Sequence, residues 1–281
     1  MTKLLVLFVF HKYDNRVKQF IEKCIFKDKN VDFIIISNNY SKKFYYPDYV
    51  KFLLRENKGY DFGGWSDGLL TNNLYKDYDN FIFVNSSVNG PYLDSDYKGK
   101  WTDIYINGLQ NNVKLFGSTI NTMATQSTPG CVAERHFLAG DVKLSYNPRK
   151  TYLPYAHVQS YIFSMNKETL EYLIECNIFS NTKYTNSLKK TVFLKEILMS
   201  RRIIEKKWNI GSLLKCYKGV DFTFSNKKPS DYNIRYYNDI MQNSARNRLW
   251  KLNEVVFIKG RGAVGRVGRG VRDRHMRSTS G

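Results

Sequence analysis

The stretch VKFLLRENKGYDFGGW, residues 50–65, decides the fold. Its first half is an apolar run typical of a buried strand, and its second half holds Gly59, Gly63 and Gly64. Glycine loses more conformational freedom on folding than any other residue, so this cluster needs a reason. A glycine turn between a strand and a helix brings backbone N–H groups close to an anionic ligand. A tight turn that binds nothing is the alternative.

The rest of the chain alternates apolar strands with amphipathic helices. The predicted strands span residues 3–10, 31–37, 50–56, 80–85, 113–121 and 157–165. The predicted helices span residues 14–26, 63–75, 101–112 and 166–179. This alternation indicates an α/β fold, with an open, mostly parallel, twisted sheet of about six strands flanked by helices. Residues 122–154 show no period, so we expect a long loop there.

The composition is that of a folded protein, because 42% of the 281 residues are hydrophobic. No apolar run approaches about 18 residues, so we expect no membrane span. The run LLVLFVF near the start lacks the cleavage site of a signal peptide. Four scattered cysteines indicate reduced thiols and a cytoplasmic location. We expect a domain over 1–225 and a C-terminal extension over 226–281, with a disordered Gly/Arg-rich tail from about residue 259.

The net charge of +19 raises the alternative of a basic nucleic-acid-binding protein. Much of this charge lies in the tail KGRGAVGRVGRGVRDRHMRSTSG. Another basic block, residues 189–208, spaces its apolar residues as a helix does, which indicates a solvated basic face. We therefore do not expect a nucleic-acid partner. The glycine turn does not match GxGxxG, and the sequence contains no GK[ST] of a P-loop, which disfavours an NTPase or a dinucleotide-binding protein.

Polar clusters follow four of the predicted strands. They read HKYD after the first strand, SNN after the second, RENKGYDFGGW after the third and NSSVNGP after the fourth. In open α/β sheets, ligands bind beyond the carboxyl ends of the strands. The sequence therefore predicts one ligand site formed by these turns.

Four characteristic motifs follow one another along the chain, and their order resembles that of a known family. They read ENKGYDFGGW, DYDNFIFVNSSVNGPYL, WTDIYINGLQNNVKLFGSTIN and HVQSYIFSMNKETLEYL. Over residues 1–220 the chain resembles glycosyltransferases with the GT-A fold, and more narrowly the N-terminal domain of multidomain glycosyltransferases of chlorella viruses. The resemblance implies a transferase that moves rhamnose or a hexose from a UDP-sugar donor to a glycan or glycoprotein acceptor. It also implies capsid-protein glycosylation in the cytoplasm of an infected host cell, and a Mn²⁺ or Mg²⁺ ion.

The resemblance implies donor contacts at two turns. The turn after the first strand would surround the nucleobase, and the glycine turn would approach the nucleotide. The residues concerned are Phe10, His11, Lys12, Tyr13, Arg55, Asn57, Gly59, Asp61 and Trp65. Arg55 is the candidate phosphate ligand, because a guanidinium binds phosphate bidentately. Trp65 is the aromatic residue expected to stack on the sugar.

The fourth strand of such folds ends in a DxD motif that holds the metal, and here the sequence departs from the pattern. The equivalent position reads Asn85-Ser86-Ser87, without a carboxylate. The strings Asp77-Tyr78-Asp79 and Asp94-Ser95-Asp96 lie nearby, but short acidic pairs of this kind often mark turns. The predicted metal ligands are Asn85, Ser87 and His157. Gln159 lies on the same strand face as His157 and is a further donor-binding candidate.

An inverting transferase needs a carboxylate that takes the proton of the acceptor hydroxyl. Asp141, in LAGDVK within the long loop, is the predicted base. A solvated loop carboxylate is the alternative, and a retaining enzyme needs no dedicated base. The missing DxD also leaves open a nucleotide-sugar-binding module without turnover.

Overall fold

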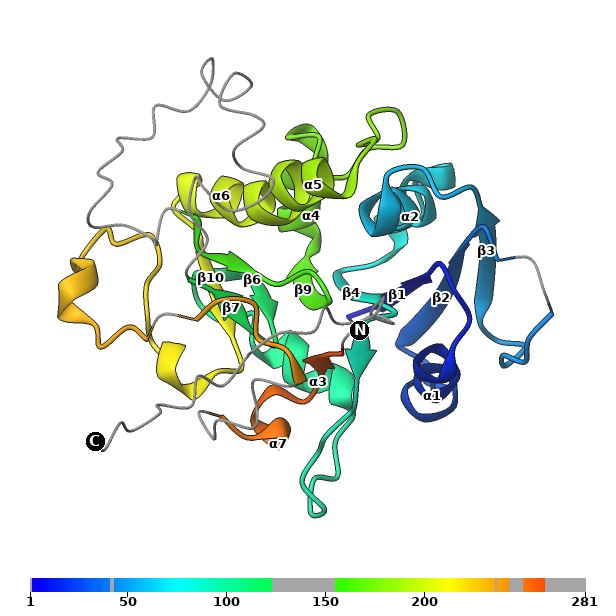
Figure 1. Ribbon diagram of the computed structural model, residues 1–281, viewed down its shortest axis with the longest axis horizontal. Coiled ribbons are helices and arrows are strands. Elements are labelled where there is room, and N and C mark those ends of the chain that lie inside the picture. The colour runs from blue at the N-terminus through cyan, green and yellow to red at the C-terminus, as the bar shows by residue number, and fades with distance from the viewer. Residues whose placement is uncertain (1, 41–42, 123–154, 236, 243–249, 261–281) are drawn as a thin grey trace, which may run out of the picture.

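A computed structural model of the chain describes residues 2–40, 43–122, 155–235, 237–242 and 250–260. Its centre is a seven-stranded sheet in the order β10-β6-β9-β4-β1-β2-β3 (Figure 1). The strands are β1 Leu4–Phe10, β2 Val31–Asn38, β3 Lys51–Arg55, β4 Asn80–Asn85, β6 Val113–Gly117, β9 Ile162–Asn166 and β10 Asn209–Ser212. All neighbours pair in parallel except β9, which runs antiparallel to β4 and β6. The predicted α/β class, with a mostly parallel sheet, is confirmed and is compatible with a GT-A-like fold.

The sheet differs from the prediction in three places. It has seven strands rather than about six, because β10 joins its edge beside β6. The segment predicted as one strand over 113–121 divides into β6 and the short strand β7 Ile120–Asn121. The segment 157–165 likewise divides into β8 His157–Val158 and β9. Because β7 and β8 pair with each other outside the main sheet, they carry polar residues to its edge.

Helices cover both faces of the sheet. In Figure 1, α2 Tyr60–Leu70, α4 Lys167–Glu175, α5 Leu188–Thr191 and α6 Leu198–Glu205 lie on one side, and α1 Asn15–Cys24 and α3 Trp101–Asn107 lie on the other. Successive residues of β1 serve the two sides in turn: Leu5 and Leu7 pack with the first group, while Val6 and Phe8 pack with the second. The continuous apolar run of β1 is therefore the signature of a strand buried on both faces.

Local signals explain where the helices begin. Asp14 caps α1 by accepting hydrogen bonds from the backbone N–H groups of Arg16 and Val17. The helix predicted over 63–75 starts earlier, at Tyr60, and ends at Leu70. A 3₁₀ turn, Thr71–Asp77, continues it, because Asn72 and its neighbour adopt positive φ angles that stop an α-helix.

The chain after residue 225 returns to the sheet. It contains a 3₁₀ turn at Pro229–Asp231, helix α7 Leu252–Val255 and strand β11 Ile258–Lys259. Strand β11 pairs antiparallel with β5 Val88–Asn89, directly after β4. The described part of the predicted extension thus supplies residues such as Trp250 and Phe257 to the two cores of the domain. The predicted disorder beyond residue 260 lies outside the described residues.

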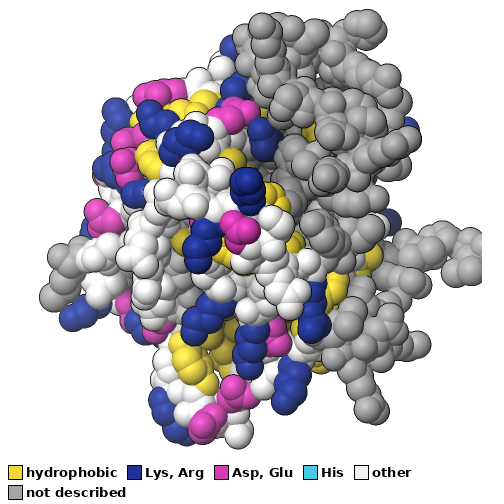
Figure 2. All heavy atoms as spheres, turned by 90° about the vertical axis from the view of Figure 1, so that its left-hand side faces the viewer, with side chains coloured by type: hydrophobic (Ala, Val, Ile, Leu, Met, Phe, Trp, Pro, Cys, Tyr) yellow, Lys and Arg dark blue, Asp and Glu magenta, His cyan; other side chains and the backbone are white. Residues whose placement is uncertain are grey.

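The structure bears on three features expected from the composition: membrane spans, the state of the cysteines and the distribution of surface charge. None of the helices within the described ranges is long and apolar enough to cross a membrane. Cys24, Cys176 and Cys216 are free thiols. On the face that Figure 2 draws, Lys and Arg side chains are interspersed with Asp and Glu side chains.

Candidate functional site

The carboxyl ends of β1, β2, β3 and β4 point to one edge of the sheet, because these strands are parallel. Residues from later parts of the chain reach the same edge through β8, β11 and the π-helical turn Val192–Ile197. We call the polar group gathered there the strand-tip site. Its members are Asp61, Asn85, Ser87, Glu196, Asp239 and Lys259.

A chain of hydrogen bonds starts the site at the tips of α2 and β4. The amide Nδ2 of Asn85 donates to Oδ2 of Asp61 at 3.0 Å. The amide oxygen of Asn85 accepts hydrogen bonds from both the backbone N–H and the hydroxyl of Ser87. Burial raises the pKa of Asp61 to about 6, although the Asn85 hydrogen bond opposes the shift. The Asp61 carboxyl therefore changes its charge close to neutral pH.

A charged group from distant segments completes the site. Lys259 Nζ lies 3.1 Å from Oδ2 of Asp239, whose other oxygen accepts a hydrogen bond from Asn121 at 2.8 Å. Burial works against the ionised form of Asp239, yet the Lys259 charge and the Asn121 hydrogen bond lower its pKa overall. The charge of Glu196 acts on both Asp61 and Lys259. Carboxylates on three separate segments thus share one electrostatic environment with a lysine.

The glycine turn has a packing reason. Gly59 has φ +74°, and a Cβ there would come within 2.8 Å of the Tyr184 ring. A Cβ on Gly63 would lie 1.9 Å from the carbonyl oxygen of Lys58, and one on Gly64 would meet Val9. These glycines let the first turn of α2 press against the strands. The glycines therefore allow the backbone of the turn to pack closely against other parts of the protein. This packing agrees with the alternative stated above, a tight turn that binds no ligand.

The guanidinium of Arg55 stabilises the same glycine turn through hydrogen bonds to three other residues. Its guanidinium donates to Asp67 at 2.6 Å, to the amide oxygen of Asn38 at 2.7 Å and to the carbonyl of Lys58 at 2.7 Å. Asp67 also accepts the hydroxyl of Tyr184 at 2.5 Å. Arg55 is thus engaged with protein partners on all its nitrogens, and its phosphate contact stays a prediction.

The other donor-binding predictions fall into three groups. Phe10 and Trp65 are fully buried in the cores, so their rings present no free face to a base or a sugar. His11 and Lys12 are exposed after β1, and His11 Nδ1 lies 2.8 Å from the backbone oxygen of Asn38. Tyr13 is half-buried and stacks on Tyr40. The role expected for Trp65 therefore needs correction, because the residue serves the core.

Three further predictions concern polar side chains near the site. Asn57 is half-buried, and its backbone N–H donates to Asn39. Ser86 is half-buried beside Ser87. Gln159 is fully buried, where its amide oxygen accepts hydrogen bonds from Thr119 and the Ile240 backbone. Gln159 thus ties β8 to the later chain instead of facing outward.

The predicted metal ligands are arranged poorly for a divalent ion. Mn²⁺ and Mg²⁺ prefer several oxygen ligands, usually with carboxylates among them. Asn85 and Ser87 are neutral and bonded to each other. His157 is buried on β8, with Nδ1 bonded to the Tyr155 backbone oxygen. Within the described ranges, no group of three or more His, Cys, Asp or Glu side chains is disposed to hold a metal. These residues do not fit the ion that the resemblance implies.

Sequence reasoning missed Glu196, Asp239 and Lys259. Glu196 lies in a helical segment whose charges read as a solvated face, yet it is 8% exposed and accepts the Ser160 backbone N–H. Lys259 stands where the Gly/Arg-rich tail begins, so nothing in the pattern marks it. The predicted base, Asp141, lies outside the described residues.

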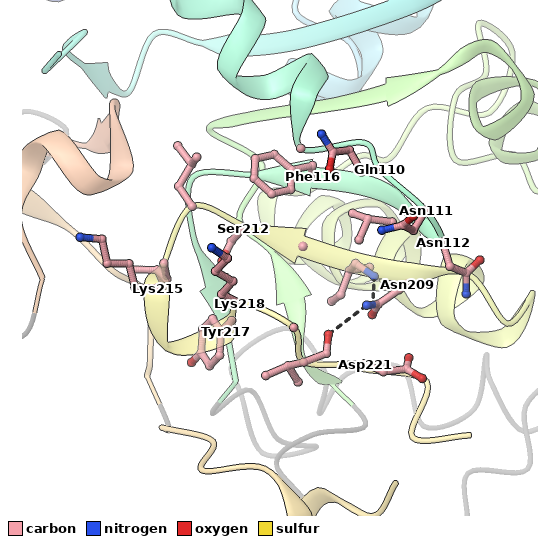
Figure 3. Close-up of a pocket in the computed structure, with 18 of the residues that line it drawn as sticks. Gln110, Asn111, Asn112, Phe116, Asn209, Ser212, Lys215, Tyr217, Lys218 and Asp221 are labelled. Carbon is pink, nitrogen blue, oxygen red and sulfur yellow. Dashed lines mark hydrogen bonds between the residues drawn. The ribbon is translucent and has the colours of Figure 1, made fainter. Parts of the chain in front are cut away.

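A hollow with a volume of about 660 Å³ lies along β10 at the far edge of the sheet (Figure 3). Amide side chains dominate its rim, among them Gln110, Asn111, Asn112 and Asn209. Asn209 is structural, because its amide donates to the Val220 backbone oxygen at 2.9 Å and its oxygen accepts two backbone N–H groups. The strand-tip residues take no part in this hollow, so we place the functional site at the strand tips.

The fold and the strand-tip site define a class: an α/β protein with a mostly parallel sheet, compatible with a GT-A-like fold, whose polar residues gather beyond the carboxyl ends of parallel strands. The family model of RgpF, rhamnan synthesis protein F, matches residues 33–253 of the chain. The protein therefore belongs to this glycosyltransferase-like family. No curated protein matches the chain.

Proposed function

We propose that the protein is a rhamnosyltransferase-type glycosyltransferase that moves a sugar from a UDP-sugar donor to a glycan acceptor. The observation that carries the proposal is the RgpF match over residues 33–253, because it covers the ends of β2, β3 and β4 and every member of the strand-tip site except Lys259. A glycan on a viral capsid protein as acceptor, and the cytoplasm of the infected cell as location, belong to the same proposal.

The transfer can be written with its atoms balanced. The bond between the anomeric carbon and the β-phosphate oxygen breaks, and its electron pair leaves with UDP. An acceptor hydroxyl oxygen forms the new bond to the anomeric carbon, and its proton passes to a carboxylate. Asp141 remains the predicted base. Asp61 supports the donor, because its half-buried carboxyl at the tip of α2 can accept hydrogen bonds from ribose or sugar hydroxyls.

The experiment measures UDP release from UDP-rhamnose and UDP-glucose, with a rhamnose oligosaccharide as acceptor. We expect turnover by the native protein and a fall in kcat/KM of about tenfold or more for Asp61→Asn, which keeps the shape and the Asn85 contact. Asp96→Asn is the matched control, because Asp96 is exposed in the loop after β5 and should leave kcat/KM unchanged. No binding and no turnover of either donor would overturn the proposal.

One observation favours a second candidate, a nucleotide-sugar-binding module without turnover. The position after β4 carries neutral residues, Asn85 to Ser87, where transferases of this fold carry metal-binding carboxylates. Calorimetry with the same donors separates the two functions. Binding without UDP release supports the module, and release above the uncatalysed rate supports the enzyme.

A further inference from the structure

Lys259 is held at the end of β4 by the backbone around it. Strand β11 pairs with β5, so that Lys259 lies opposite Val88. The next residue, Gly260, donates its N–H to the backbone oxygen of Ser87 at 2.7 Å. A Cβ on Gly260 would meet that oxygen at 3.2 Å, so the close pairing suits a glycine. The lysine therefore occupies a defined place beside the residues that stand where a DxD motif is expected.

The surroundings of Lys259 are acidic. Its ammonium pairs with Asp239 at 3.1 Å, and the charges of Glu196 and Asp61 also act on it. Burial by itself would lower the pKa of Lys259, but these three carboxylates together raise it. The side chain of Lys259 is thus held in its charged form.

The partners of Lys259 are themselves fixed. Asn85 donates to Asp61, the Ser160 backbone donates to Glu196, and Asn121 donates to Asp239. Asp239 is the accessible partner, because its side chain is 46% exposed while that of Lys259 is 27% exposed. An anion arriving from solvent would therefore compete with Asp239 for the ammonium.

We propose that Lys259 supplies the positive charge that binds the diphosphate of the donor, in the part that a divalent ion plays in transferases with a DxD motif. This inference rests on the proposed function. Oxygen atoms of the diphosphate replace the Asp239 carboxylate at the ammonium. When the anomeric C–O bond breaks, the electron pair passes to the β-phosphate oxygen, and the nearby ammonium stabilises that charge. The acceptor proton leaves to the carboxylate base, as above.

The proposal agrees with the residues at the strand tips. Asn85, the last residue of β4, and Ser87, two residues later, are neutral and bonded to each other. A lysine needs no carboxylate ligands of its own to be charged, whereas a divalent ion needs several. Lys259 on β11 then supplies the positive charge that a metal ion bound to a DxD motif would otherwise provide.

The test compares the affinities for UDP and uridine by calorimetry, in EDTA and in Mn²⁺. We expect the native protein to bind UDP equally in both solutions. Lys259→Met should weaken UDP binding by about 10- to 100-fold, as for the loss of a charge-assisted hydrogen bond, and leave uridine binding unchanged. Lys259→Arg should restore most of the UDP affinity. Asp239→Asn should strengthen UDP binding, because it removes the competing carboxylate and keeps an acceptor for Asn121.

The control is Lys251→Met, an exposed lysine just before α7, which should bind UDP as the native protein does. UDP binding that needs Mn²⁺, or that survives Lys259→Met, would overturn the inference and leave the proposed function standing. A merely structural ion pair would lower thermal stability in Lys259→Met and Asp239→Asn alike without raising UDP affinity in the latter, and this too overturns it. If the native protein binds neither UDP nor the two UDP-sugar donors, both proposals fail together.

Discussion

Arg55 and Asp67 form a largely buried ion pair, with 2.6 Å between Nε and Oδ2 and an arginine side chain that is 8% exposed. The pair joins the end of β3 to the second half of α2, across the turn that holds the glycines. The Tyr184 ring lies 5.7 Å from the guanidinium carbon and donates its hydroxyl to the same aspartate. This arrangement explains how a glycine-rich turn keeps one conformation.

Replacing Arg55 should therefore destabilise the fold. Removing one partner of a buried ion pair leaves the other charge uncompensated, which costs about 3 to 5 kcal/mol. We expect a loss of this size in the free energy of urea unfolding for Arg55→Met. The control is Lys58→Met, which breaks the solvent-exposed pair with Glu56 and should leave the free energy of unfolding almost unchanged. Equal losses in the two variants would contradict the role assigned to Arg55.

Gly59 in the glycine turn can be compared with Gly219, because the two residues have similar positive φ angles. Gly59 and Gly219 have φ angles of +74° and +77°, but only Gly59 has a neighbour that a Cβ would strike. Gly219→Ala should cost only the backbone strain, about 1 kcal/mol. Gly59→Ala should cost clearly more in thermal unfolding, because Tyr184 must also move. If the costs are the same, packing against Tyr184 does not explain the glycine.

Substitutions of Trp65 test whether this residue serves the hydrophobic core or the sugar-binding site. Its indole packs edge-on against Phe62, Phe83 and Phe163, and its ring N–H is buried without a partner. Trp65→Ala should lower the free energy of unfolding by about 3 to 5 kcal/mol. Trp65→Phe should cost less, because it fills most of the space and removes the unpartnered N–H. Donor affinity in Trp65→Phe should match that of the native protein, and a marked loss would return Trp65 to the sugar site.

The sequence predicts the centre of the fold well. Strands β1, β2 and β4 are continuous apolar runs buried on both sides, and such runs are recognisable without neighbours. Strand β10 was missed because its four residues, NIGS, contain one large apolar side chain. Its conformation depends on pairing with β6, a contact that no local pattern encodes.

The candidate site, like the fold, is predictable from the sequence only in part. Asp61 lies in the first turn of the helix after β3 and Asn85 is the last residue of β4, so the rule for strand ends finds them, and the structure joins them by a hydrogen bond. Glu196 and Lys259 reach the site through tertiary packing of a helical segment and a late strand. The burial of Trp65 could not be predicted, because adjacency to a glycine turn does not say on which side of a helix a ring points. Sequence neighbours of a turn are therefore less informative than the strand tips themselves.

A last prediction concerns Lys195, a lysine that is 7% exposed in the π-helical turn. Its ammonium donates to the backbone oxygen of Asn177 at 2.5 Å. Burial lowers the pKa of Lys195 from its ordinary value of 10.5 to about 8. Below about pH 8 the lysine is charged in both the folded and the unfolded chain, so the folded protein bears the full cost of a buried charge.

Between about pH 8 and 10.5 the unfolded chain holds the extra proton, so the stability attributable to Lys195 rises with pH. Lys195→Met removes the charge and should stabilise the protein at pH 7 by about 1 to 3 kcal/mol. This gain should shrink towards zero near pH 10.5. Urea unfolding at pH 7, 9 and 10.5 measures it, with the exposed Lys189→Met as control. A gain that is constant across this range would show that the charge of Lys195 is not what limits stability there.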